Sequence, residues 1–276
     1  MAKGPLAAAL AAILLWSALA WFGLALAGWP PFLLVGCALV VGALAGLPRV
    51  REWRVPPAAL ALGVYGLFGF HFLLFMALRS APPVQANLVN YLWPLLIVLL
   101  APLFTPGLRL ATRHVMAGVA GFAGAALVVT GGSVSLQGAH LAGYAMAAGS
   151  AFVWATYSLA SKRFAGVPTA AVGAYCLASG LAALACHALL EPRHVPAPRD
   201  LAVLAALGIG PMGAAFYLWD YALKRGDPRA IGALAYLTPM LSTLLLVAAG
   251  HGALTPASVF GMVLIIGGAV AGTLRR

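Results

Sequence analysis

Aromatic, amide and hydroxyl side chains recur along single faces of several long apolar segments. In the segment 140–161, five of them follow one another at steps of four, three, one and three residues, which places them on one side of a helix. They are Ser150, Trp154, Tyr157, Ser158 and Ser161. Hydroxyls on such a face either pack helices together or line a binding cavity, and both interpretations stay open for the serines. The central position of Trp154, with an indole N–H to satisfy, favours a cavity, and we count Trp154, Tyr157 and Ser158 as candidate binding residues.

A second polar face lies in the segment 83–102 and ends at Pro94. Pro94, like Pro239 in the segment 229–249, removes a backbone donor and frees a carbonyl in mid-segment. Paired breaks of this kind point to a transport site, whereas a plain kink that shapes packing is the alternative. We predict hinges at both prolines. The candidate binding residues on or beside them are Asn87, Tyr91, Trp93 and Thr238, with Asn90 on the same face.

His71 is the only histidine well inside an apolar segment, and it shares a helical face with Phe68, Phe72 and Phe75. A neutral imidazole bonded to a neighbouring helix, a ring contact to substrate and a proton site are the three readings of this residue. In the segment 201–223, a further candidate, Tyr217, precedes an acid–base pair. Asp220 and Lys224 are four residues apart and predict a local ion pair at the membrane edge. We therefore include Phe68, His71 and Tyr217 in the candidate binding site.

The composition shows what kind of protein must position these residues. Hydrophobic residues make up 63% of the 276 residues and charged residues only 8%. A soluble domain has about 25% charged residues, so this chain cannot cover a surface in water. It is predicted to be an all-α integral membrane protein, since lipid cannot satisfy free backbone groups and the apolar runs do not alternate as barrel strands do.

Charged residues and turn signals divide the chain into apolar runs of membrane-spanning length. We predict ten transmembrane helices near 5–26, 31–47, 57–78, 83–102, 114–131, 140–161, 168–190, 201–223, 229–249 and 256–274. With ten spans both termini lie on one side of the membrane. That side collects 13 of the 16 basic residues, including Lys3, Arg49, Arg275 and Arg276. Because Lys and Arg stay in the cytoplasm, both termini are predicted to be cytoplasmic.

The chain also contains an internal repeat. Residues 77–100 and 222–245 share nine of 24 positions, among them Tyr91 with Tyr236 and Pro94 with Pro239. Halves of five spans enter the membrane in opposite directions, so we predict two inverted five-helix repeats, 1–135 and 136–276, in a single membrane domain. Such an arrangement is typical of secondary transporters.

Three strings carry a family resemblance: ANLVNYLWPLL at 86–96, YLWDYALKRGDP at 217–228 and AYLTPMLSTLLL at 235–246. With the ten-span inverted arrangement, they resemble the drug/metabolite transporter superfamily in its ten-helix EamA-type branch, and most of all the YddG group. The resemblance covers the whole chain and implies export of aromatic amino acids. One departure is Asp220, where an asparagine is commoner, so no substrate-binding role is assigned to it.

The sequence thus predicts a carrier rather than an enzyme, exporting aromatic or other neutral amino acids by facilitated diffusion through alternating access. A proton-coupled exporter of other metabolites or drugs is the alternative, and a membrane enzyme a remote one, because the five acidic residues are scattered. We expect no cofactor, no metal and no nucleic-acid partner. The expected partners are a small-molecule substrate and membrane lipid. We expect a monomer in the cell inner membrane.

Overall fold

The computed structural model describes residues 3–133 and 136–273 and contains no strand within them. Arg275 and Arg276, which contribute to the predicted charge asymmetry, lie outside the described residues. The helices are α1 (Lys3–Ser17), α2 (Leu19–Ala25), α3 (Pro31–Leu44), α4 (Pro57–Val64), α5 (Phe70–Ser80), α6 (Pro83–Asn90), α7 (Leu92–Phe104), α8 (Thr112–Thr130), α9 (Leu141–Ala160), α10 (Val172–Leu190), α11 (Pro198–Ile209), α12 (Ala215–Arg225), α13 (Pro228–Ala235), α14 (Leu237–Ala248) and α15 (Pro256–Thr273). The 3-10 segments are η1 (Leu47–Trp53), η3 (Gly138–His140), η4 (Ser161–Phe164) and η5 (Thr169–Ala171). The segments η2 (Tyr65–Gly69) and η6 (Gly210–Ala214) are π-helical.

The all-helical, membrane-type fold agrees with the prediction. Eight of the described helices or helix combinations are long and apolar enough to cross a membrane, and a ninth is obtained if α3 and η1, bent by 93°, count as one span. Proline opens α3, α4, α6, α11, α13 and α15, where its missing N–H is not needed.

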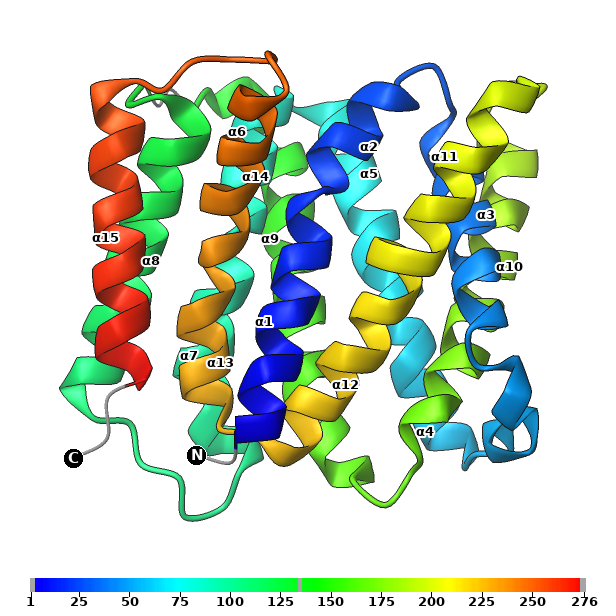
Figure 1. Ribbon diagram of the computed structural model, residues 1–276, viewed down its shortest axis with the longest axis horizontal. Helices are drawn as coiled ribbons and strands as arrows, with labels where there is room; N and C mark the ends of the chain where they lie inside the picture. The colour runs from blue at the N-terminus through cyan, green and yellow to red at the C-terminus, as the bar shows by residue number, and fades with distance from the viewer. Residues whose placement is uncertain (1–2, 134–135, 274–276) are drawn as a thin grey trace.

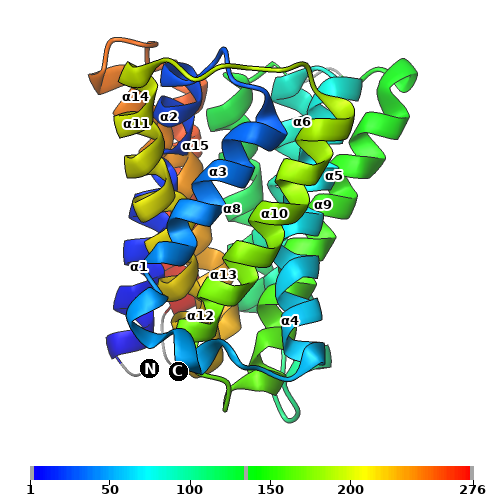
Figure 2. The same cartoon turned by 90° about the vertical axis from the view of Figure 1, so that its right-hand side faces the viewer.

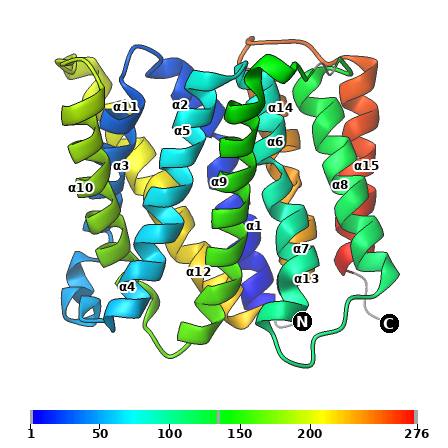
Figure 3. The same ribbon diagram turned by 180° about the vertical axis from the view of Figure 1, so that it is seen from behind.

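The helices form two rows (Figures 1 and 3). The row that faces the viewer in Figure 1 runs α15, α14 with α13, α1, α12 with α11, and α3. The row behind it, seen in Figure 3, runs α8, α6 with α7, α9, α5 with α4, and α10. The N- and C-termini lie at the same end of the bundle. Each row therefore takes helices from both halves of the sequence.

The ends of the two rows are closed by helices that approach at glycine. A methyl group added to Gly124 of α8 would lie 2.5 Å from the carbonyl oxygen of Gly261 in α15. At the opposite end, visible in Figure 2, α3 meets α10, and a methyl group on Gly180 would lie 2.9 Å from the Gly36 carbonyl. Such close backbone approach is how membrane helices gain packing energy without a hydrophobic driving force.

Irregularities of the backbone recur 145 residues apart. The π-helical segment η2 is followed 145 residues later by η6, and the break at Tyr91 by the break at Tyr236. Even the backbone angles at the two tyrosines agree, with φ −64° and ψ 4° at Tyr91 and φ −67° and ψ −11° at Tyr236. The offset equals the one that aligns the sequence strings around Pro94 and Pro239.

Candidate binding cavity

A cavity of about 490 Å³ lies between the two rows, in the half of the bundle away from the termini. Its wall reaches Phe22 and Gly23 on α2 and Leu78 and Pro83 at the α5–α6 turn, which are positions at that end of the bundle. A cavity of this size suits a small organic solute. Six of the predicted binding residues line it: His71, Asn87, Tyr91, Trp93, Trp154 and Thr238.

An aromatic cluster forms the inner end of the cavity. Trp16 lies at its centre, with ring centroids 5.7 Å from Trp154, 6.4 Å from Trp93 and 5.9 Å from Phe216. Trp219, 1% exposed, packs beneath at 5.1 Å from Trp16. Edge-to-face and tilted contacts of this kind are favourable between aromatic rings, so the cluster offers both ring faces and ring edges to a solute above it.

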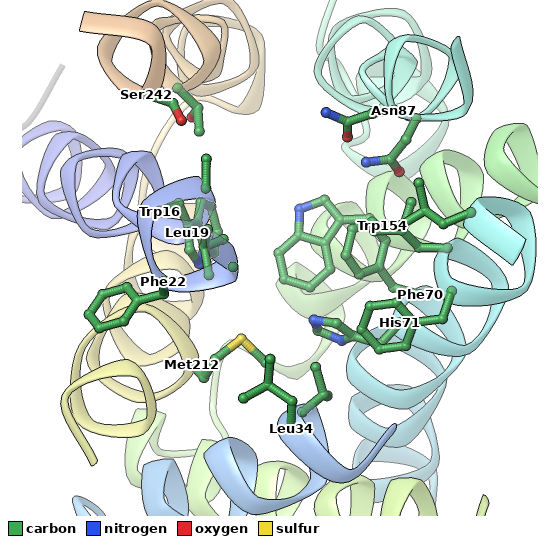
Figure 4. A pocket seen from close by; sticks show the side chains of 18 of the residues that line it. Trp16, Leu19, Phe22, Leu34, Phe70, His71, Asn87, Trp154, Met212 and Ser242 are labelled. Carbon is green, nitrogen blue, oxygen red and sulfur yellow. The ribbon is translucent and has the colours of Figure 1, made fainter. Parts of the chain in front are cut away.

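Figure 4 shows the side walls of the cavity. Asn87 and Ser242 face one another across one end, whereas Met212 and Leu34 lie at the other. His71 points into the space between these ends. Within the described parts of the chain, no Asp, Glu, Lys or Arg lines the cavity. The wall is therefore aromatic and apolar with a few uncharged polar groups.

The π-helical segments provide carbonyl groups that side chains of the cavity wall use. His71 Nδ1 lies 2.6 Å from the Leu67 carbonyl of η2, and Trp16 Nε1 donates to the Pro211 carbonyl of η6 at 3.1 Å. Because a carbonyl oxygen only accepts, the Nδ1 of His71 carries the proton and its Nε2 is the acceptor of the neutral ring. His71 is thus held at Nδ1 by its own helix, and of the three readings the bond to a neighbouring helix does not occur at this atom.

Four predicted binding residues lie outside the cavity. Phe68 packs against Phe72, with ring centroids 5.7 Å apart. The π turn of η2 adds a residue to the helical turn, so Phe68 and His71 do not share a face as they would in a regular helix. Tyr157 and Ser158 lie about one turn past Trp154, below the aromatic cluster. Tyr157 packs on Gly66, and the Ser158 hydroxyl accepts from Trp219 Nε1 at 3.0 Å.

Tyr217 is the fourth of these residues. Its hydroxyl donates to the Gly42 carbonyl at 3.4 Å, near the end of α3 that lies toward the termini. Tyr217 lies five residues, about one and a half turns, beyond the lining residue Met212 along this helix, so it is below the level of the cavity.

The predicted hinges coincide with broken helices. Pro94 and Pro239 are buried, and each break lies one turn before its proline, at Tyr91 and Tyr236. A proline ring clashes with the carbonyl four residues earlier, which explains this spacing.

Several lining residues were not among the predicted site residues: Trp16, Phe70, Met212, Phe216 and Ser242. Phe70 was missed because the π turn places its ring, rather than that of Phe68, beside Trp154, with ring centroids 5.3 Å apart. Met212 lies within the second π turn and Phe216 follows it, and the sequence offers no local indicator of that turn.

The end of the bundle near the termini is closed by a buried ion pair. Lys224 Nζ lies 2.9 Å from Asp220 Oδ2, and the two side chains are 3% and 1% exposed. Thr169 also donates to Asp220 Oδ2, and Lys224 donates to the Val167 carbonyl, each at 2.9 Å. The predicted ion pair is confirmed, and it is buried between α12 and the segment that leads into α10.

Known proteins resemble the chain over almost its whole length. The EamA-like transporter family matches residues 2–130 and again residues 141–273. An aromatic amino acid exporter YddG of Ancylobacter novellus is 44% identical over 272 residues, which are 95% of this chain and 94% of that protein. An aromatic amino acid exporter YddG of Salmonella typhimurium is 28% identical over 216 residues, 72% of this chain and 71% of the relative. A solved crystal structure, 42% identical, matches with a TM-score of 0.95 over 99% of this chain and 97% of that one.

Proposed function

This chain belongs to the EamA-like transporter family, and we propose that it exports aromatic and other large neutral amino acids. Membership in a transporter family confirms the prediction of a multi-pass membrane carrier rather than an enzyme. The observation that carries the substrate proposal is the cavity itself. Its inner end is built from Trp16, Trp93 and Trp154, and its described lining holds no charged side chain. An aromatic ring stacks on such a surface, and an overall neutral solute needs no fixed countercharge.

For the architecture, we propose ten spans in two inverted repeats, 1–135 and 136–276. This adds α3 and the 20-residue α9 to the eight spans that length and hydropathy select. The π segments, helix breaks and prolines that recur 145 residues apart support it, as does the separate match of the family to 2–130 and 141–273. Alternating access then exchanges the open and closed ends, with the breaks beside Pro94 and Pro239 as hinges.

We further propose that both termini are cytoplasmic, in the inner membrane, so that the cavity faces outward in this conformation. The monomer bundle contains both rows and the whole cavity, which supports action as a monomer surrounded by lipid. Transport is proposed to be facilitated diffusion. His71 is the one residue with an ordinary pKa near neutrality among the described residues that line the cavity, and a coupled carrier needs a second proton site within reach.

The substrate proposal is tested by counterflow of labelled L-phenylalanine and L-tryptophan into proteoliposomes. We expect uptake well above that of protein-free vesicles, and Trp154→Ala should reduce it at least tenfold while the protein stays folded. Trp21→Ala is the matched control, because Trp21 is 38% exposed and does not line the cavity. Absence of counterflow in the wild type would refute the proposal. Accumulation driven by an imposed pH gradient, and lost in His71→Gln, would instead establish proton antiport.

The orientation is tested by labelling a single cysteine at position 52, in a variant whose native Cys37, Cys176 and Cys186 are replaced by serine or alanine. A membrane-impermeant maleimide should fail to label this cysteine in intact cells and should label it after the membrane is opened. Efficient labelling in intact cells would contradict the ten-span topology.

A further inference from the structure

The amide and hydroxyl groups of the cavity wall are gathered at one end of the cavity. They come from α6, the break after it and α14: Asn87, Asn90, Tyr91, Thr238 and Ser242. At the other end, Leu34 of α3 and Met212 of η6 present only apolar atoms and sulfur, as Figure 4 shows. The cavity is therefore divided into a polar end and an apolar end, with the rings of Phe70, His71 and Trp154 along the wall between them.

The polar end has hydrogen-bonding groups that the protein leaves unused. Thr238 is 8% exposed, and its Oγ1, which is itself buried, has no partner among the described residues. Ser150 donates to Oδ1 of Asn90 at 2.8 Å, which fixes the amide so that its Nδ2 remains a donor at the cavity wall. Buried polar groups are almost always bonded in native proteins, so an unused hydroxyl in a cavity indicates a ligand group.

We propose that the amino acid binds with its α-ammonium and α-carboxylate between α6 and α14 and with its ring directed toward Phe70, His71 and Met212. This orientation rests on the proposed function. Charged groups leave water only when they are hydrogen-bonded, and the two faces with spare amide and hydroxyl groups meet at this end alone. The ring then lies against aromatic and thioether surfaces, which favour it without specifying a particular ring. Thr238 and Asn87 are the residues that select for an α-amino acid.

The test measures how strongly head-group analogues bind. Purified protein is reconstituted, and counterflow of labelled L-phenylalanine is inhibited by unlabelled L-phenylalanine, by phenethylamine, which lacks the carboxylate, and by 3-phenylpropionate, which lacks the ammonium. Thermal stabilisation of the protein by each compound gives a second readout, of binding alone. A hydrogen bond to a charged group corresponds to about tenfold or more in affinity, so the wild type should prefer L-phenylalanine by at least that ratio.

Three variants separate the two ends of the cavity. Thr238→Val keeps the shape and removes the hydroxyl, Asn87→Leu removes the amide, and Met212→Ala alters only the apolar end. We expect Thr238→Val and Asn87→Leu to weaken the binding of L-phenylalanine several-fold. The affinity for at least one truncated analogue should stay unchanged, so the preference for L-phenylalanine over that analogue should fall. Met212→Ala should change the ranking of phenylalanine, tryptophan and leucine and leave the head-group ratios unchanged.

The results also distinguish this orientation from the proposed function. One outcome would overturn the orientation: Met212→Ala lowers the preference for L-phenylalanine over its head-group analogues, and both Thr238→Val and Asn87→Leu leave that preference unchanged. Stabilisation by L-phenylalanine without counterflow would refute export, and the stabilisation ratios would still decide the orientation. If L-phenylalanine is neither bound nor transported by the folded wild type, both proposals are wrong.

Discussion

The broken helices α6–α7 and α13–α14 have matching backbones, 145 residues apart, but their tyrosines have different surroundings. Tyr91 lines the cavity, whereas Tyr236 is 0% exposed and its hydroxyl accepts the backbone N–H of Leu95 at 3.1 Å. Similarly, α6 presents Asn87 to the cavity, while nearly every residue of α13 is buried. The two matching breaks therefore differ in exposure, because the first borders the cavity and the second is buried.

Substitutions at the end of the bundle near the termini should lower the stability of the protein more than substitutions at the cavity, and those in the Asp220–Lys224 ion pair should have the largest effect. Lys224→Met leaves Asp220 buried without its countercharge, which costs about 3–5 kcal/mol of stability. We expect most of the protein to be misfolded or to melt at a much lower temperature in detergent. Arg225→Met is the control, because Arg225 is exposed on the same helix. The double variant Asp220→Asn with Lys224→Met should recover much of the loss, and failure to recover would contradict the ion-pair explanation.

The two tyrosines offer a direct test of the difference between the breaks. Tyr236→Phe removes the acceptor of the Leu95 N–H, and a buried donor without a partner costs about 1–3 kcal/mol. Tyr91→Phe should change stability by about 0.5 kcal/mol or less, because its side chain lies at the cavity wall, and should act on transport instead. Thermal melting and counterflow of both variants check this. Equal melting temperatures would show that the two breaks are equivalent after all.

A smaller effect is expected where the second broken helix begins. Asp227 accepts from the backbone N–H of Arg229 at 2.9 Å and pairs with its guanidinium at 2.7 Å, whereas the equivalent residue before α6 is Pro82. Burial raises the pKa of Asp227, but the hydrogen bonds from Arg229 outweigh it and hold the pKa below its usual value.

The sign of this pKa shift sets a pH dependence. A lowered pKa means that the charged carboxylate stabilises the fold above the unfolded pKa of about 3.9, and that this contribution is lost as pH falls through the folded value. Asp227→Asn keeps the cap and removes the charge, so its melting temperature should lie slightly below that of the wild type at pH 7. The gap should close below about pH 4. A gap that persists in acid would show that the pairing with Arg229 is not responsible.

The sequence predicted those features that depend on composition and on proline. The helical membrane fold, the breaks near Pro94 and Pro239, and the inward position of Trp154 and His71 follow from hydropathy, from a missing N–H and from the cost of polar groups in lipid. The depth of Tyr157 and Tyr217 did not follow, because a helical face says which way a side chain points and not at which level a cavity ends. Phe68 was misplaced because the π turn at Tyr65–Gly69 changes the helical period and has no strong sequence indicator.

The uncharged wall of the cavity has an electrical consequence. A membrane potential of 100 mV does about 2.3 kcal/mol of work on each elementary charge that crosses the bilayer. The proposed substrate is a zwitterion, and no Asp, Glu, Lys or Arg in the described lining travels with it. The proposed facilitated cycle would therefore move no net charge, so the cell's voltage would neither drive nor oppose it, and the two substrate concentrations alone would set the direction of flow.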